Sequence, residues 1–260
     1  MGILNLTPDS FSDGGLFLNK DKALNHVQQM ITDGAQIIDI GGESTRPGAK
    51  DVSVDEECER VIPLIKAIRE TSDIPISIDS RKPEVMQQAI DAGASMINDV
   101  NALRTDRAVE LAAKLDVPVC IMHMQGKPRT MQETPSYKDV VKEVKNFLQQ
   151  RIDVCLEAGI KKDNIIIDPG FGFGKTVEHN FVLFKNLVEF EKLGQPLLVG
   201  VSRKSMIGAI LENAPADKRL HGSVALATLA AWMNANILRV HDVKATSDAL
   251  KLCMAVKNIK

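Results

Sequence analysis

Short apolar runs recur along the chain, and most of them end in a polar residue. Eight such runs occur, at 2–5, 37–39, 76–79, 96–98, 119–122, 165–168, 197–200 and 237–241. The run at 165–168, three isoleucines followed by aspartate, is the clearest, and Pro169 and Gly170 end it. Apolar runs of this length are typical of strands that are buried on both faces in a parallel sheet. The sequence therefore predicts eight buried parallel strands.

Segments with a helical period separate these runs. We expect helices at 20–33, 53–72, 83–92, 106–115, 138–158, 177–192, 223–234 and 245–259, with a further short helix after Ser202. The second of them opens on Ser53 with Glu56 three residues later, which is the pattern of a capping box. Eight strand–helix units in 260 residues predict an α/β fold, a (β/α)8 TIM barrel that forms a single domain over 1–260. The alternative is an open doubly wound sheet, which rarely needs eight such even units.

In a barrel of this kind the active site lies at the C-terminal ends of the strands. The residues that this sequence places there are Asn5, Asp39, Asp79, Asn98, Met122, Asp168, Arg239 and His241. A single one of them is equally well interpreted as a turn residue that caps the next helix. The whole set is not, because caps belong in the loop before a helix and these residues belong to the strands.

The chemistry of this ring points to a ligand class. Carboxylate and amide oxygens that converge on one mouth suit a ligand rich in N–H donors, such as an amino-substituted heterocycle. Arg239 and His241 stand two apart on one strand, so they share a face and suit an anion, for which we expect phosphate. The segment 202–205, Ser-Arg-Lys-Ser, begins the short helix, and its N–H groups suit a carboxylate or phosphate. The alternative for that segment is a basic surface turn.

Composition and failed motifs exclude other classes. The glycine-rich segment 170–175 ends in Gly-Lys like a P-loop, but Pro169 stands where that motif needs glycine. The net charge is −2 and the chain contains no block of lysine and arginine, which argues against nucleic acid as the main ligand. No apolar run approaches the ~18 residues of a membrane span, and the first residues show no charged leader.

Cysteine and histidine spacing bears on metals and compartment. The four cysteines, Cys58, Cys120, Cys155 and Cys253, lie far apart and form no C-x-x-C pair. We interpret them as free thiols in a reducing compartment, and we expect a cytoplasmic protein. No cluster of histidine and cysteine has metal-ligand spacing, so any cation bound here is expected to be Mg²⁺, held largely by substrate phosphates and one or two protein oxygens.

Five segments resemble the signatures of one enzyme family, the dihydropteroate synthases. They are GILNLTPDSFSDGG at 2–15, GGESTRPG at 41–48, DPGFGFGK at 168–175, SRKS at 202–205 and RVHD at 239–242. The resemblance covers essentially the whole chain, and long motifs in this order are highly specific. It implies a reaction in which 4-aminobenzoate displaces pyrophosphate from 6-hydroxymethyl-7,8-dihydropterin pyrophosphate, giving 7,8-dihydropteroate for folate synthesis.

The resemblance also implies roles for individual residues. The pterin would be bound by Asp79, Asn98, Asp168, Lys204, Arg239, Met122 and Phe173, with Arg239 stacking over it. The pyrophosphate would be bound by Asn5, Thr45, Arg239 and His241, and Asn5 would hold Mg²⁺. Phe11, Asp13, Arg46 and Pro47 would belong to loops that close the site, and with them Ser205 would contact 4-aminobenzoate or the sulfonamides that imitate it.

One position departs from the family pattern, and the function and the oligomeric state each leave an alternative open. Ser80 and Arg81 follow Asp79, where the family commonly has threonine in the first position. One alternative function is a related pterin-binding barrel that hands a methyl group to a corrinoid protein, and another is a non-catalytic pterin-binding protein.

The helix around 223–235 is apolar or small on nearly every face, which together with the resemblance predicts a homodimer. The alternative is that this helix lies under loops of its own barrel.

Overall fold

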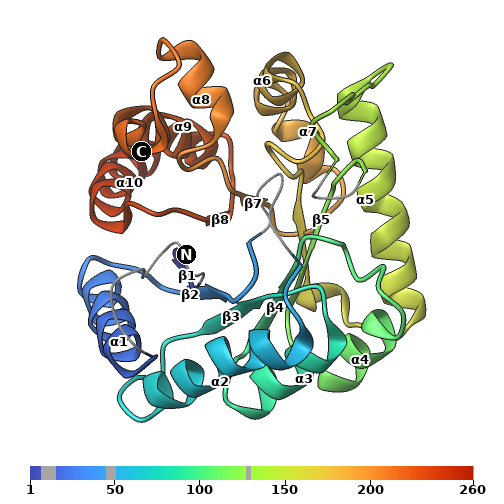
Figure 1. Ribbon diagram of the computed structural model, residues 1–260. Coiled ribbons are helices and arrows are strands. Elements are labelled where there is room, and N and C mark those ends of the chain that lie inside the picture. Colours follow the sequence, from blue (N-terminus) through green and yellow to red (C-terminus); the bar gives the residue numbers. More distant parts are fainter. Residues whose placement is uncertain (7–15, 45–50, 127–129, 260) are drawn as a thin grey trace.

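The computed structural model describes residues 1–6, 16–44, 51–126 and 130–259, without the side chains of 16–19. In these parts of the chain strands and helices alternate (Figure 1). The strands are β1 (Gly2–Asn5), β2 (Ile38–Gly41), β3 (Ile76–Asp79), β4 (Met96–Asp99), β5 (Val119–Met122), β6 (Ile165–Asp168), β7 (Leu198–Val199) and β8 (Ile237–Leu238). The helices are α1 (Leu16–Thr32), α2 (Val54–Arg69), α3 (Pro83–Asp91), α4 (Ala108–Leu115), α5 (Val140–Glu157), α6 (Val177–Lys185), α7 (Val188–Glu191), α8 (Ser205–Ile210), α9 (Leu220–Trp232) and α10 (Val243–Lys257), with 3₁₀ turns η2 (Lys162–Asn164) and η3 (Ala216–Lys218).

The strands run parallel and close into a ring. β1 to β6 form one sheet in chain order, and β7 pairs with β8. Two parallel bridges join the sheets, Ile167 with Leu197 and Gly2 with Val240. At the second of them the amide of Ile3 donates to the carbonyl of Val240 over 3.0 Å. The predicted (β/α)8 TIM barrel is confirmed, and the open doubly wound sheet is wrong for this chain.

Alternation along each strand divides the core into layers. Outward residues such as Ile38, Ile76 and Ile167 belong to a large apolar cluster with the helices, whereas Met96, Cys120, Ile166 and Leu198 form a small separate cluster. Successive strand residues point to opposite faces, so this second cluster fills the inside of the barrel. Figure 1 shows the helices outside the ring of strands. This explains why β6 has isoleucine on both faces, since Ile165 and Ile167 pack against the helices and Ile166 lies inside the barrel.

Two predicted helices differ from the observed ones in an informative way. The helix expected at 177–192 is wrong as a single element, because α6 ends at Lys185 and a separate short helix, α7, begins at Val188. At the junction the Asn186 side chain donates to the carbonyl of Val182 over 2.8 Å. The helix expected to begin at Lys20 begins at Leu16 instead. Elsewhere the capping prediction is confirmed, since Ser53 Oγ accepts from the amide of Glu56 over 3.2 Å.

Candidate active site at the barrel mouth

The inward residues at the C-terminal strand ends are polar. Asp39 is fully buried, and Asn98 and Asp168 are 4 % and 6 % exposed. Asp79 and Asn98 stand in register on β3 and β4, two residues beyond Ser77 and Met96 and so on the same face of the sheet. Strand pairing thus sets these side chains at one level, with the apolar interior of the barrel beneath them.

Arg239 joins two of the carboxylates. It leaves the end of β8, and its Nε lies 2.6 Å from Asp39 Oδ2 while Nη2 lies 2.7 Å from Asp79 Oδ2. Asn98 Nδ2 also faces Asp39, at 3.4 Å from each carboxylate oxygen. Asp39 therefore holds both a cation and an amide in place. The sequence placed Asp39 in the ring but gave it no role, because its partner lies 200 positions away.

Charge in this group is finely balanced. Burial raises the pKa of Asp79 to about 7, because the Arg239 cation only partly offsets desolvation and the neighbouring Asp39 adds repulsion. Burial also raises the pKa of Asp168, although the amide of Gly170 donates to its Oδ1 over 2.7 Å. Burial alone would lower the pKa of Arg239, but Asp39 and Asp79 hold it above its usual value.

Lys204 approaches from the loop after β7. Its Nζ donates to the carbonyl of Phe171 and lies 4.2 Å from the centre of the Phe173 ring. Burial lowers the pKa of Lys204 to about 8, against the attraction of Asp168. A cation over an aromatic face beside a carboxylate suits a flat ligand with both donors and acceptors.

An apolar wall stands beside these polar groups. Val100, Met122, Met124 and Met131 form a buried cluster against which Phe173 packs. On the other side Gly200 has no side chain, and a Cβ there would stand 3.8 Å from the Cβ of Arg239. A small residue at this inward position leaves room at the mouth for a ligand.

His241 follows two residues after Arg239, and both lie just beyond β8, which ends at Leu238, earlier than the strand expected at 237–241. Its backbone amide and its Nδ1 both contact Ser202 Oγ, at 3.1 Å and 3.0 Å. Ser202 is a residue that sequence reasoning placed only within the 202–205 motif, and here it fixes the orientation of the imidazole. Its neighbour Arg203 turns away to bind Asp242, with Nε 3.0 Å from Oδ2. Arg203 is thus tied to a carboxylate, and Ser205 is an exposed residue at the start of α8.

The remaining predicted residues divide into two groups. Asn5 ends β1 opposite Gly41, at the same edge of the ring as Asp79. Phe11, Asp13, Thr45, Arg46 and Pro47 lie outside the described residues. Within the described ranges no group of three histidine, cysteine, aspartate or glutamate side chains is placed to hold a metal ion.

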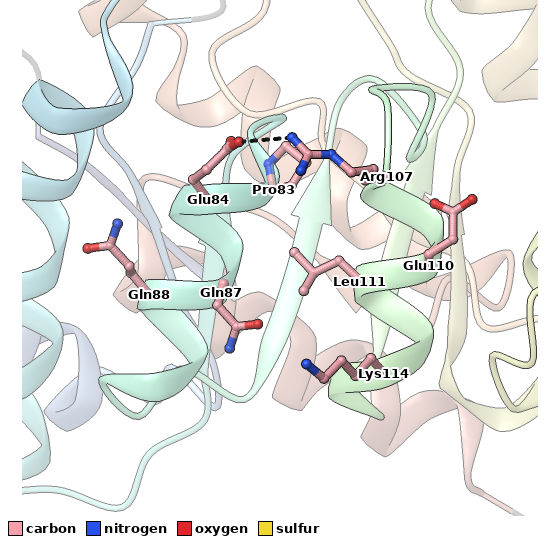
Figure 2. Close-up of a pocket in the computed structure, with 8 residues that line it drawn as sticks. All are labelled: Pro83, Glu84, Gln87, Gln88, Arg107, Glu110, Leu111 and Lys114. Carbon is pink, nitrogen blue, oxygen red and sulfur yellow. Dashed lines mark ion pairs between the residues drawn. The ribbon is translucent and has the colours of Figure 1, made fainter.

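A shallow groove elsewhere on the molecule is not part of this group. It lies between α3 and α4 on the outer flank of the barrel, with a volume of about 530 Å³ (Figure 2). Leu111 and the exposed pair of Glu84 and Arg107, 3.7 Å apart, belong to its lining. It holds none of the strand-end residues.

Comparison with known proteins decides the family. The profile described as "Pterin binding enzyme" matches residues 1–241. A dihydropteroate synthase from Haemophilus influenzae is 57 % identical over 258 residues, which is 99 % of this chain and 94 % of that protein. The chain belongs to the dihydropteroate synthase family of pterin binding enzymes.

Solved dihydropteroate synthases have the same fold. The Yersinia pestis enzyme, solved in complex with a sulfonamide drug, superposes with a TM-score of 0.95 at 49 % identity, over 100 % of this chain and 94 % of the other. The Xanthomonas albilineans dihydropteroate synthase, solved with 4-aminobenzoic acid, gives a TM-score of 0.95 at 48 % identity, over 100 % and 93 %. The family resemblance inferred from the motifs is confirmed, and the chain is an enzyme of the transferase class.

Proposed function

We propose that the chain condenses 6-hydroxymethyl-7,8-dihydropterin pyrophosphate with 4-aminobenzoate, giving 7,8-dihydropteroate and pyrophosphate for folate biosynthesis. The observation that carries this proposal is the ring of Asp39, Asp79, Asn98 and Asp168 around Arg239 at the barrel mouth. Membership of the dihydropteroate synthase family supports it independently.

Each part of the site has a task in this reaction. Asp79, Asn98 and Asp168 accept from the N–H groups of the pterin, Lys204 donates to it, and Arg239 covers it. Met122 and Phe173 supply the apolar wall. Buried carboxylates give strong, directional acceptors for a ring that carries several N–H donors.

Bond breaking precedes attack by the amine in our proposal. The C–O bond to pyrophosphate breaks and its electron pair leaves with the oxygen, while the electron-rich pterin carries the positive charge on its exocyclic methylene. The amine nitrogen then forms the new C–N bond and loses one proton. No protein nucleophile is needed, so the residues orient the substrates, stabilise charge and exclude water.

The leaving group needs positive charge at the edge of the mouth. We assign the pyrophosphate to Asn5, Thr45, Arg239 and His241, with Mg²⁺ held by Asn5 and phosphate oxygens. Mg²⁺ would supply neutralisation of the leaving group's charge. The imidazole of His241, fixed by Ser202, is oriented before the anion arrives.

The second substrate is assigned to the loops above the mouth. Phe11, Asp13, Arg46, Pro47 and Ser205 would form the 4-aminobenzoate site, which is also where sulfonamides would bind. Relatives solved with 4-aminobenzoic acid and with a sulfonamide support these two ligand classes.

Two further proposals concern the setting of the enzyme. We infer a homodimer, because Leu229 and Trp232 on α9 and Leu252 on the adjacent α10 are more than half exposed. We also place the reaction in the cytoplasm, because all four cysteines are buried free thiols. In the described parts of the chain no helix is long and apolar enough to cross a membrane.

A pyrophosphate-release assay tests the proposal. Release should require both the pterin substrate and 4-aminobenzoate, and dihydropteroate should appear in equal amount. A barrel that transfers a methyl group would release no pyrophosphate, and a non-catalytic pterin-binding protein would bind the substrate without turnover. Either outcome overturns the proposed reaction.

A further inference from the structure

Lys175 is buried where two loops of the barrel mouth meet. Its side chain is almost inaccessible, at 2 % exposure, yet the ammonium is fully satisfied. Nζ donates to the carbonyls of Gly170 and Phe173 over 2.9 Å and 3.1 Å, and lies 2.9 Å from Nδ1 of His123. The carbonyl of His123 is a fourth, longer contact at 3.4 Å, so each N–H of the ammonium has an acceptor, which is what makes a buried ammonium tolerable.

The glycines of the same loop allow this contact. Gly170 and Gly174 both have positive φ, and a Cβ on them would stand 1.9 Å from the carbonyl oxygen of His123 and 2.4 Å from that of Gln125. The backbone of the loop after β6 therefore rests directly on the backbone of the loop after β5. Tyr137 adds a further tie, since its hydroxyl donates to the carbonyl of Gly174 over 2.7 Å.

Phe173 connects the contact between these two loops to the candidate site. Lys175 holds the carbonyl of Phe173, and the ring of Phe173 lies under the ammonium of Lys204. Lys204 in turn binds the carbonyl of Phe171 in the same loop. The positions of Phe173 and Lys204 thus both depend on the turn that Lys175 closes.

We propose that Lys175 is a positioning residue for the pterin pocket, where its ammonium locks the 170–174 turn onto His123 and so sets Phe173 against Lys204. The inference rests on the proposed function, because it assigns Phe173 and Lys204 to the pterin. Lys175 acts through these two residues and through the shape of the turn.

The decisive variant is Lys175→Met, which keeps the length and the apolar stem of the side chain and removes the ammonium. We expect the affinity for a pterin without pyrophosphate, measured by calorimetry on the folded full chain, to fall by about 10-fold or more. The KM for the pterin substrate should rise in parallel, while the KM for 4-aminobenzoate changes much less. Lys185→Met is the matched control, because Lys185 is an exposed lysine in the last turn of α6, and it should bind the pterin like the unchanged chain.

A second pair of variants keeps the proposal testable if Lys175→Met does not fold. His123→Asn retains an acceptor in place of Nδ1, whereas His123→Leu removes it, so the asparagine variant should bind the pterin more tightly than the leucine variant. Equal pterin affinity in this pair, or unchanged affinity in folded Lys175→Met, would overturn the inference. So would equal losses for the pterin and 4-aminobenzoate, which indicate general loosening.

Asp168→Asn distinguishes a failure of the proposed role of Lys175 from a failure of the proposed pterin site. If it weakens pterin binding and Lys175→Met does not, the pterin site stands and the role of Lys175 fails. If Asp168→Asn has no effect either, the proposed pterin site itself is wrong.

Discussion

Arg239 donates to Asp79 across the barrel mouth, with its Nη2 2.7 Å from Oδ2. The contact joins β8 to β3, and the guanidinium extends on to Asp39 on the neighbouring strand. A ligand that uses Asp79 must therefore share this carboxylate with Arg239. The Arg239 guanidinium both offsets the negative charge of these two carboxylates and faces the position proposed for the leaving pyrophosphate.

Loss of either the Asp79 or the Asp168 carboxylate should weaken pterin binding directly. Asp79→Asn and Asp168→Asn each replace a charged acceptor by a neutral amide, and we expect the affinity for a pterin without pyrophosphate to fall by about 10- to 100-fold. Calorimetry measures this. Asp106→Asn is the control, because the Asp106 side chain is 95 % exposed. Unchanged affinity in the Asp79→Asn and Asp168→Asn variants contradicts the assignment.

His241 should serve the anion and not the heterocycle. His241→Ala removes an imidazole that Ser202 orients, so the affinity for pyrophosphate should fall by about 10-fold while that for a phosphate-free pterin stays nearly unchanged. Parallel titrations with the two ligands make the test. Equal losses for both ligands would assign His241 to the pterin as well.

Pterin affinity should depend on pH through two groups. Asp79 binds N–H donors as a carboxylate, so affinity is lost as the pH falls below its pKa of about 7 in the free enzyme. Lys204 donates as an ammonium, so affinity is also lost as the pH rises above its pKa of about 8. A plot of pterin affinity against pH should therefore be bell-shaped. Asp79→Asn should remove the acidic limb only, and a limb that persists in this variant must come from another group.

The dimer has a built-in reporter. Trp232 is the single tryptophan of the chain and is 52 % exposed on α9, so its fluorescence should shift to the red when the dimer dissociates. Leu229→Arg places a charge on the same face and should yield a monomer by light scattering at micromolar concentration. Leu156→Arg on α5, where the leucine is 41 % exposed, is the control. An unchanged chain that is already monomeric refutes the dimer.

Sulfonamide binding should depend on the other substrate's leaving group. Most of the proposed 4-aminobenzoate pocket comes from loops, which commonly close over a site only after a ligand binds. We expect weak sulfonamide binding to the free enzyme and much tighter binding with pyrophosphate and Mg²⁺ present. Inhibition should be competitive with 4-aminobenzoate. Non-competitive inhibition, or affinity indifferent to pyrophosphate, would place the pocket elsewhere.

The sequence predicted the barrel because each strand is short, apolar and followed by a helical period. It missed the break after Lys185, since the apolar pattern continues through the junction and only Asn186 signals the helix end. It also placed Asp39 and Ser202 without their roles. Those roles arise from pairings across the barrel, with Arg239 and His241, that no local pattern encodes.

Lys175 is the clearest example of what local patterns leave out. In the sequence it stands in a failed P-loop motif, and a lysine is normally an exposed residue. Its burial follows from the backbone path of Gly170 and Gly174, which brings the carbonyls of two loops together. Three-dimensional closure of the loops, and not residue type, decides its role.

The long reach of Arg239 has a consequence for synthesis of the protein. Asp39 and Asp79 leave the ribosome first, and their cation follows 200 and 160 positions later. Until β8 is made, the two carboxylates have no guanidinium to offset their desolvation. We therefore expect the mouth of a partly synthesised barrel to stay hydrated and open. The last strand thus completes the wall and the charge of the pocket in one event, and a nascent chain that stops short of it lacks both Arg239 and His241.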